Sequence, residues 1–137
     1  MTSKTIYITK YDWLVSFYVV DTCKDIQPII YSIKDKKTRT KITNKIKSCG
    51  INTGLTYSKG RKTIMIIGRS TCAKEFLNTL THEIFHLAIH IGKYYDLDLA
   101  SEETAYIVGD FVPKIYDNIN HLICNCHDRR RAHKIVY

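Results

Sequence analysis

The sequence predicts an α+β fold: a mostly antiparallel sheet with helices in the N-terminal half, then two long helices. Two observations predict it. Segments rich in β-branched and aromatic residues, separated by turn residues, occur in pairs before residue 68, which is typical of β-hairpins. From residue 76 onward, apolar residues recur at spacings of three and four, which is typical of amphipathic helices. A chain of 137 residues can bury one core without disulfide support.

Four strands are expected, in two hairpins. The first hairpin joins residues 5–9 to residues 13–20, and both segments consist mainly of β-branched and aromatic residues. The second joins residues 53–58 to residues 63–67 through the turn Lys59-Gly60-Arg61. The strand at 63–67 immediately precedes the helix described below as the metal helix. We therefore predict that this strand forms the sheet edge along the site, where an extended peptide can add to it.

Two shorter helices are expected between the hairpins. Asp21-Thr22 provides an N-cap, and the helix after it has four isoleucines at helical spacing: Ile26, Ile29, Ile30 and Ile33. Pro28 fits this helix only in its first turn, because proline has no N–H to donate. A second short helix places Ile42 and Ile46 inward and ends near Gly50.

Two long helices are expected in the second half. The first runs from about Cys72 to about Ile91, and Gly92 is its natural stop. Ser101 caps the second helix, in which Pro113 either produces a kink or starts a further helix. We expect one domain over residues 1–123 and a basic, loosely ordered tail over residues 124–137.

Composition limits the classes of function. No apolar stretch approaches the roughly 20 residues of a membrane span, and the N-terminus does not read as a signal peptide. Five cysteines without an export signal are typical of reduced thiols, so we expect a cytoplasmic protein without a membrane partner. The net charge of +8 comes largely from residues 34–47 and 129–134. Such runs are usually solvated, so nucleic-acid binding through the basic tail is the less favoured interpretation.

One motif has a definite chemical meaning: His82-Glu83-Ile84-Phe85-His86, which reads H-E-x-x-H. On a helix, His82 and His86 share a face about 6 Å apart along the axis and can bind one Zn²⁺. Glu83 lies beside them, where its carboxylate can take a proton from a metal-bound water.

A catalytic zinc needs a third protein ligand. His90 lies about 12 Å along the helix axis from His82, which is too far for one ion. Glu102 and Glu103 begin the next helix, which can return antiparallel beside His86. Small residues should occur where two helices approach closely, and Ala105 and Gly109 lie on the face of Glu102. We therefore prefer Glu102 over Glu103 as the third ligand.

The two motifs together resemble the gluzincin metallopeptidases, which carry H-E-x-x-H on one helix and E-x-x-A on the next. The stretch from Asn78 to Asp110 is also similar to small peptidase-like proteins encoded by bacteriophages and prophages. The resemblance implies a minimal zincin-like domain and a zinc-dependent peptidase acting on a protein or peptide. It assigns His82, His86 and Glu102 as ligands and Glu83 as general base. A phage origin would place the protein in the host cytoplasm or the virion.

Several residues are candidates for supporting roles. The donor to a tetrahedral oxyanion is expected among four tyrosines and one histidine: Tyr57, Tyr94, Tyr95, Tyr106 and His90. Asp110 can orient a histidine ligand by accepting a hydrogen bond from its ring, and Glu103 can support the ligands in the same way. Cys124, Cys126 and His127 match structural zinc spacing poorly.

The alternative functions are a non-catalytic binding or virion-associated protein with this fold and, less favoured, a basic nucleic-acid-binding protein.

Overall fold

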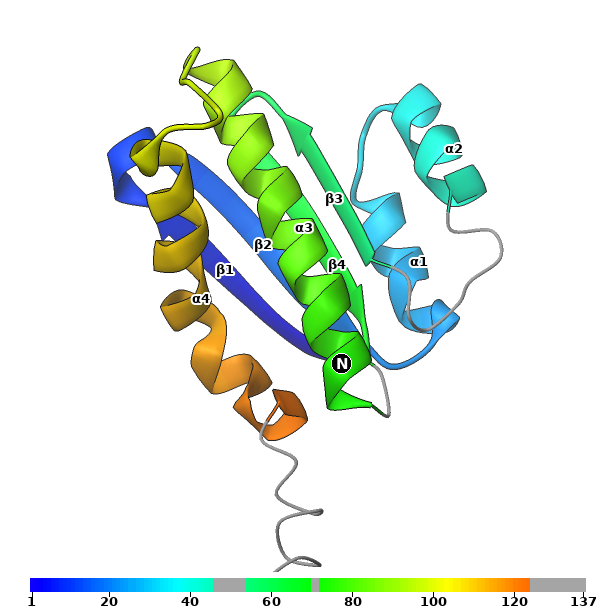
Figure 1. The fold of residues 1–137 in the computed structure, drawn as a ribbon. Helices are drawn as coiled ribbons and strands as arrows, with labels where there is room; N and C mark the ends of the chain where they lie inside the picture. Colours follow the sequence, from blue (N-terminus) through cyan, green and yellow to red (C-terminus); the bar gives the residue numbers. More distant parts are fainter. Residues whose placement is uncertain (46–53, 70–71, 124–137) are drawn as a thin grey trace, which may run out of the picture.

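The computed structural model describes residues 1–45, 54–69 and 72–123 (Figure 1). These residues form an α+β fold with a four-stranded mixed sheet and four α-helices. In chain order the elements are β1 (Thr2–Ile8), the 3₁₀ turn η1 (Thr9–Tyr11), β2 (Trp13–Val20), α1 (Cys23–Tyr31), α2 (Lys36–Lys45), β3 (Gly54–Lys59), β4 (Lys62–Gly68), α3 (Ala73–Tyr94) and α4 (Glu102–Ile123). The predictions for Ile46, Gly50 and the tail from Cys124 onward lie outside the described residues.

The sheet has the strand order β1-β2-β4-β3. Both predicted hairpins are present, because β1 pairs antiparallel with β2 and β3 pairs antiparallel with β4. The central pair, β2 and β4, is parallel. The prediction that the 63–67 strand forms the sheet edge is wrong, since β4 lies inside the sheet and β3 is the edge strand. Met65 and Ile67 of β4 are fully buried, as a central strand requires.

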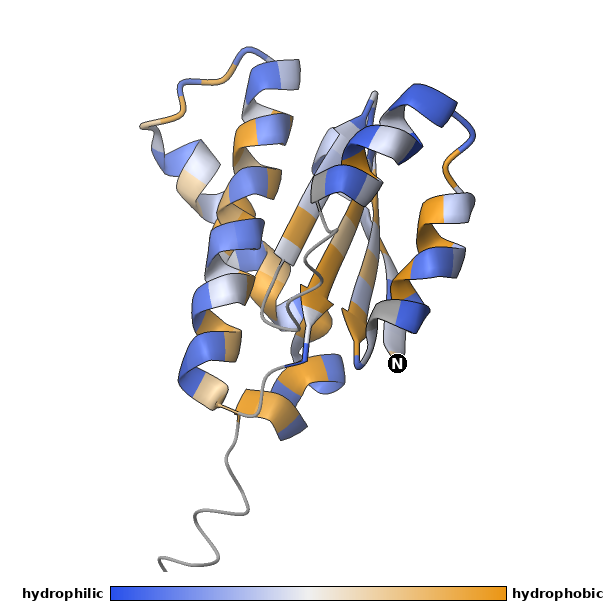
Figure 2. Ribbon diagram, turned by 90° about the vertical axis from the view of Figure 1, so that its right-hand side faces the viewer, coloured by the Kyte–Doolittle hydropathy of each residue, from blue (hydrophilic) through white to orange (hydrophobic). Residues whose placement is uncertain are grey.

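Helices cover both faces of the sheet (Figure 2). Alternate side chains of β2, beginning with Trp13 and Val15, contribute to a core under α3 and α4. Val20, with Leu55 of β3 and Ile66 of β4, packs with the isoleucines of α1 and Ile42 of α2 in a second core. Because both faces are covered, β2 and β4 consist largely of apolar residues.

Two prolines lie inside helices. Pro28 is the sixth residue of α1, so the expectation that it would occupy the first turn is wrong. Its ring is exposed, where the loss of one backbone donor costs least. Pro113 does not start a new helix but lies within the single helix α4, which changes direction in its second half (Figure 1). Neither of the 22-residue helices α3 and α4, nor any other described helix, has the apolar length needed to cross a membrane.

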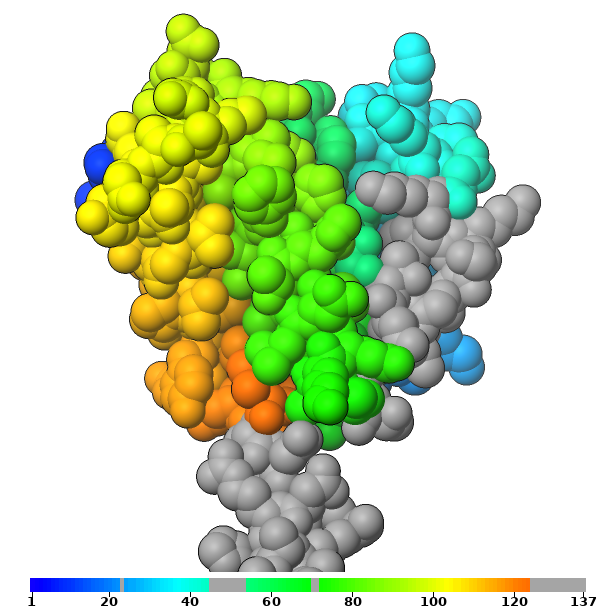
Figure 3. Space-filling model, viewed as in Figure 1, coloured from blue at the N-terminus to red at the C-terminus, as the bar shows by residue number. Residues whose placement is uncertain are grey.

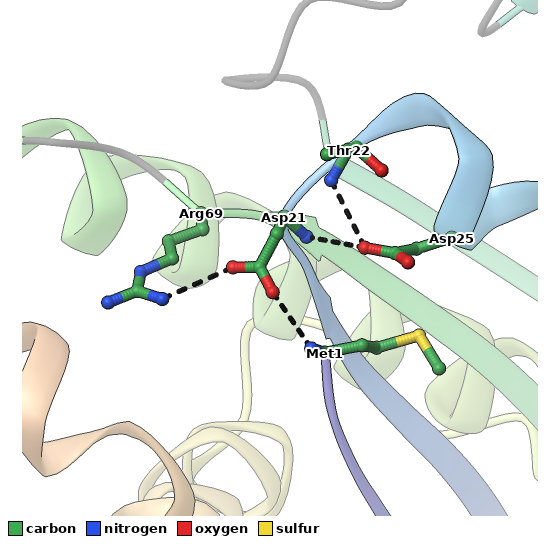
Figure 4. A network of polar contacts seen from close by, with 5 residues as sticks. All are labelled: Met1, Asp21, Thr22, Asp25 and Arg69. Carbon is green, nitrogen blue, oxygen red and sulfur yellow. Dashed lines mark hydrogen bonds and ion pairs between the residues drawn. The ribbon is translucent and has the colours of Figure 1, made fainter.

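A charged network joins the ends of β1, β2 and β4 (Figure 4). The Asp21 carboxylate accepts hydrogen bonds from the Met1 amino group at 2.8 Å and from the Arg69 guanidinium at 3.2 Å. These two cations lower the pKa of Asp21 below its ordinary value of 3.8. Thr22 and Asp25 form the capping box of α1, as the N-cap prediction required.

Replacement of Phe111 by alanine should destabilise the fold by about 3–5 kcal/mol, because the ring is 1% exposed and packs edge-on against Phe17. Urea denaturation of the variant measures this loss. Val112→Ala on the exposed side of α4 is the matched control and should change stability by less than about 1 kcal/mol. Equal effects of the two substitutions would contradict the described packing of α4.

Replacement of Asp21 by asparagine should remove stability at neutral pH but not in acid. Because the folded-state pKa of Asp21 is lowered, its stabilising contribution is present above pH 3.8 and is lost as the pH falls below that value. The stability difference between wild type and variant, measured by urea denaturation from pH 7 to pH 2, should therefore shrink below pH 4. Asp117→Asn is the matched control, because it alters an exposed aspartate of α4 that is in no ion pair within the described residues.

Candidate functional site

The candidate site lies where α3 crosses the edge strand β3. The side chains of β3 that face α3 are at positions 54, 56 and 58, and all are small or hydroxylated. Gly54 leaves room for the helix, because a Cβ atom there would lie 2.6 Å from Glu83 Cγ and 2.8 Å from Thr79 Cγ2. The Thr56 hydroxyl lies 2.8 Å from Glu83 Oε1 and 3.1 Å from the Glu83 carbonyl oxygen, and donates to them. Glu83 is thus a buried carboxylate, 6% exposed, held against β3.

The two motif histidines converge on the same flank of the helix. The Nε2 atoms of His82 and His86 are 3.0 Å apart, and the ring centroids are 4.7 Å apart. His82 is exposed and His86 is half-buried, so the pair opens to solvent. Two nitrogens bound to one tetrahedral zinc at 2.0–2.1 Å would lie about 3.3 Å apart. With little adjustment, the two nitrogens could therefore occupy two of the four coordination positions of a zinc ion.

His90 extends this row by one turn and is fixed by hydroxyl groups of the sheet. Its Nδ1 lies 2.6 Å from Ser58 Oγ, which lies 2.7 Å from Thr63 Oγ1. The Trp13 indole N–H donates to Thr63 Oγ1 at 2.7 Å. The ring centroid of His90 is 6.3 Å from that of His86. Of the candidates for supporting roles, His90 is the one that the structure places beside the pair.

The two glutamates at the start of α4 lie elsewhere. Glu103 accepts a hydrogen bond from the Tyr11 hydroxyl at 2.9 Å and pairs with Lys10 at 3.4 Å. These contacts lower the pKa of Glu103, while burial and the same hydrogen bond raise the pKa of Tyr11. Glu102 is exposed. Figures 1 and 3 show α3 between α4 and β3, so the start of α4 and the histidine row are on different sides of α3.

The expected small-residue contact between α3 and α4 is also absent from the described structure. Ala105 and Gly109 are exposed, and a Cβ on Gly109 would have no neighbour within 4 Å. The face of Glu102 that was expected to meet α3 therefore points to solvent. The buried stripe of α4 is formed instead by Thr104, Ile107, Phe111, Ile115 and Ile119.

The other candidates for supporting roles contact other parts of the molecule. Tyr106 and Asp110 line a depression of about 140 Å³ between η1 and α4. Tyr94 packs edge-on against Trp13, Tyr95 lies tilted beside the same ring, and the Tyr95 hydroxyl also donates to the Tyr11 carbonyl. The Tyr57 hydroxyl contacts Thr38 on the opposite face of the sheet.

The donor set fits a divalent metal in part. His82 and His86 converge, with Glu83 one residue away along the chain. However, across residues 1–45, 54–69 and 72–123 no three His, Cys, Asp or Glu side chains are placed together as a metal site requires. The structure thus brings together the two histidines, Glu83 and His90, and does not bring Glu102 to them.

Sequence reasoning missed the contribution of β3. The alternation Gly54-x-Thr56-x-Ser58 was available as a signal, because three small residues on one face of a strand indicate close approach of another element. Thr63, which links Ser58 to Trp13, is one of the few buried polar residues and was read only as part of a strand.

Comparison with known proteins adds no relative, because no protein-family model, curated protein or solved structure matches the chain. The functional interpretation therefore depends on the geometry of this site.

Gly54→Ala should destabilise the fold by about 1–3 kcal/mol, because the added methyl group would overlap the Glu83 side chain and Thr79. Chemical denaturation measures the change. Gly109→Ala is the matched control: it adds the same methyl group in open space on a helix, and should be neutral or stabilise by up to about 1 kcal/mol. A Gly54→Ala variant as stable as wild type would show that β3 and α3 are not in close contact.

Proposed function

We propose that the protein is a zinc-dependent peptidase in which His82 and His86 bind the metal and Glu83 is the general base. The observation that carries this proposal is the 3.0 Å separation of the two Nε2 atoms beside a buried, hydrogen-bonded carboxylate. One ring N–H can donate to the other ring nitrogen across this distance, as the tautomers allow. A shared cation would satisfy both nitrogens.

Each residue has a definite task in this proposal. A bound zinc ion would polarise the peptide carbonyl and acidify a coordinated water. Glu83 accepts the proton of the attacking water and passes it to the leaving amine. Thr56 orients that carboxylate through its hydroxyl, and the close contact at Gly54 shields it from bulk solvent. His90, with Nδ1 held by Ser58, is the nearest additional donor for the developing oxyanion.

Glu102 remains the proposed third ligand. Glu103 is already engaged by Tyr11 and Lys10, whereas Glu102 is exposed and in no ion pair among the described residues. Coordination by Glu102 requires the start of α4 to move relative to α3. The proposal therefore includes a rearrangement on metal binding, and metal affinity is the quantity that tests it.

The proposed substrate is an extended peptide bound along β3. This strand has one partner in the described sheet, β4, so its outer edge can accept main-chain hydrogen bonds from another strand. Its inward-facing residues touch Glu83 and His90. A peptide on this edge would thus lie near the histidine pair.

A non-catalytic binding protein with the same fold is the second candidate. The incomplete ligand set of the described residues favours it, because catalytic zinc sites normally have three protein ligands. The two candidates differ in their requirement for Glu83, which binding alone does not need as a base.

The purified protein should bind one zinc ion per chain, measured by equilibrium dialysis and elemental analysis. His82→Ala and His86→Ala should abolish binding, since each removes a nitrogen of the pair. Glu102→Gln should weaken it, whereas Glu103→Gln, the matched control, should not. A folded wild-type protein that binds no zinc would refute the metal site. Equal zinc affinity of wild type and Glu102→Gln would exclude Glu102 as a ligand but would not exclude the histidine site.

Glu83→Gln should retain zinc and lower peptide cleavage by about 10²- to 10⁴-fold, as expected for loss of a general base. Cleavage is measured as new N-termini in a mixture of peptides from a cell proteome, because the natural substrate is unidentified. Thr56→Val, which removes the hydroxyl but keeps the shape, should have a smaller effect in the same direction. Identical peptide patterns for wild type and Glu83→Gln, both loaded with zinc, would favour the binding protein.

A further inference from the structure

A second concave site lies on the face of the sheet opposite the histidine pair. It is a groove of about 440 Å³ between the connection from α1 to α2 and the strands β2, β3 and β4. Its lining contains three hydroxyl residues, Ser16, Ser32 and Thr63. The floor is formed by four largely apolar residues: Leu14, Ile33, Tyr57 and Ile64. The last three belong to the edge of the second core and are only partly buried, so the helices leave this end of the sheet open.

The rim of the groove is basic. Lys34 from the α1–α2 connection, Lys59 from β3 and Lys62 from β4 surround the floor, and all three are exposed. The ion pairs within the described residues form elsewhere and involve Lys10, Arg61, Arg69 and the Met1 amino group.

One acidic residue, Asp35, lies on the same rim, and its carboxylate is engaged locally. It accepts hydrogen bonds from the Thr38 hydroxyl at 2.5 Å and from the Lys37 backbone N–H at 3.2 Å. The groove therefore combines an apolar floor with an excess of positive charge at its mouth.

We propose that this groove binds a small organic anion: a carboxylate, phosphate or sulfonate group attached to an apolar chain or ring. The volume is within the range of ligand pockets, about 300–1,000 Å³. The apolar part covers Leu14, Ile33 and Ile64, which would otherwise remain partly exposed to water. The anionic group lies between Lys59 and Lys62, which are paired neighbours across the β3–β4 hairpin.

The proposal does not depend on the histidine pair, because the two sites use opposite faces of β3. Residues 54, 56 and 58 face α3, whereas Tyr57 and Lys59 line the groove. Loss of zinc binding or of catalysis in a Glu83 or His82 variant would therefore leave the groove intact.

Anilinonaphthalene sulfonate, which joins a sulfonate to aromatic rings, is a suitable probe. Its fluorescence should rise on titration with the folded wild-type protein and saturate at one molecule per chain. Lys59→Glu with Lys62→Glu should weaken binding at least 10-fold. The matched control, Lys36→Glu with Lys41→Glu, makes the same charge change on α2 outside the groove and should change affinity less than 2-fold. Circular dichroism verifies that both double variants are folded.

Competition defines the ligand further. Laurate and phenyl phosphate should displace the probe, and the stronger competitor identifies a chain or a ring as the preferred apolar part. Inorganic phosphate at the same concentration should not displace it. The absence of saturable binding, equal losses in the two double variants, or displacement by inorganic phosphate alone would each overturn the proposal.

Discussion

The close approach of α3 to the edge strand β3 is the constraint on which the candidate site depends. It exists because position 54 has no side chain, and a methyl group there would overlap Glu83 and Thr79. The approach buries Glu83 while Thr56 supplies a hydrogen bond, since an unpaired buried carboxylate would be costly. With Glu83 turned to the strand, helical geometry places His82 and His86 on the adjacent outer flank.

Much of the fold follows from local patterns in the sequence. Both hairpins and the presence of the helices were predictable, because the spacing of apolar residues reports burial. Two helix boundaries were not: α2 already begins at Lys36, in a basic stretch without apolar periodicity, and Gly92, expected to end α3, lies buried inside it. The order of the strands was not, since the parallel pairing of β2 with β4 joins segments that α1, α2 and β3 separate along the chain. The same limit applies to the site. The motif predicts the convergence of His82 and His86, but the placement of Glu102 depends on how α4 packs against its neighbours.

Two residues that the sequence made candidates for the site, Glu103 and Tyr95, instead stabilise the connection where the chain turns from α3 into α4. Tyr11 packs against Tyr95 and donates to Glu103, which also pairs with Lys10. Hydrogen bonding to Tyr11 and pairing with Lys10 lower the pKa of Glu103, whereas burial, together with the hydrogen bond to Glu103, raises the pKa of Tyr11. These interactions fasten η1 to the ends of both long helices. A sequence motif cannot distinguish such a structural carboxylate from a ligand, because both favour the first turn of a helix.

The alternation of side chains along β3 has an energetic consequence. Strand β3 runs from Gly54 to Lys59, and its even-numbered residues face α3 whereas Tyr57 and Lys59 line the groove on the other side of the sheet. A shift or tilt of the strand therefore alters both faces together. If a ligand on one face prefers one position of β3, its binding free energy becomes linked to binding on the other face. Thermodynamic reciprocity then makes the two effects equal in size. This edge strand thus physically connects the two surfaces.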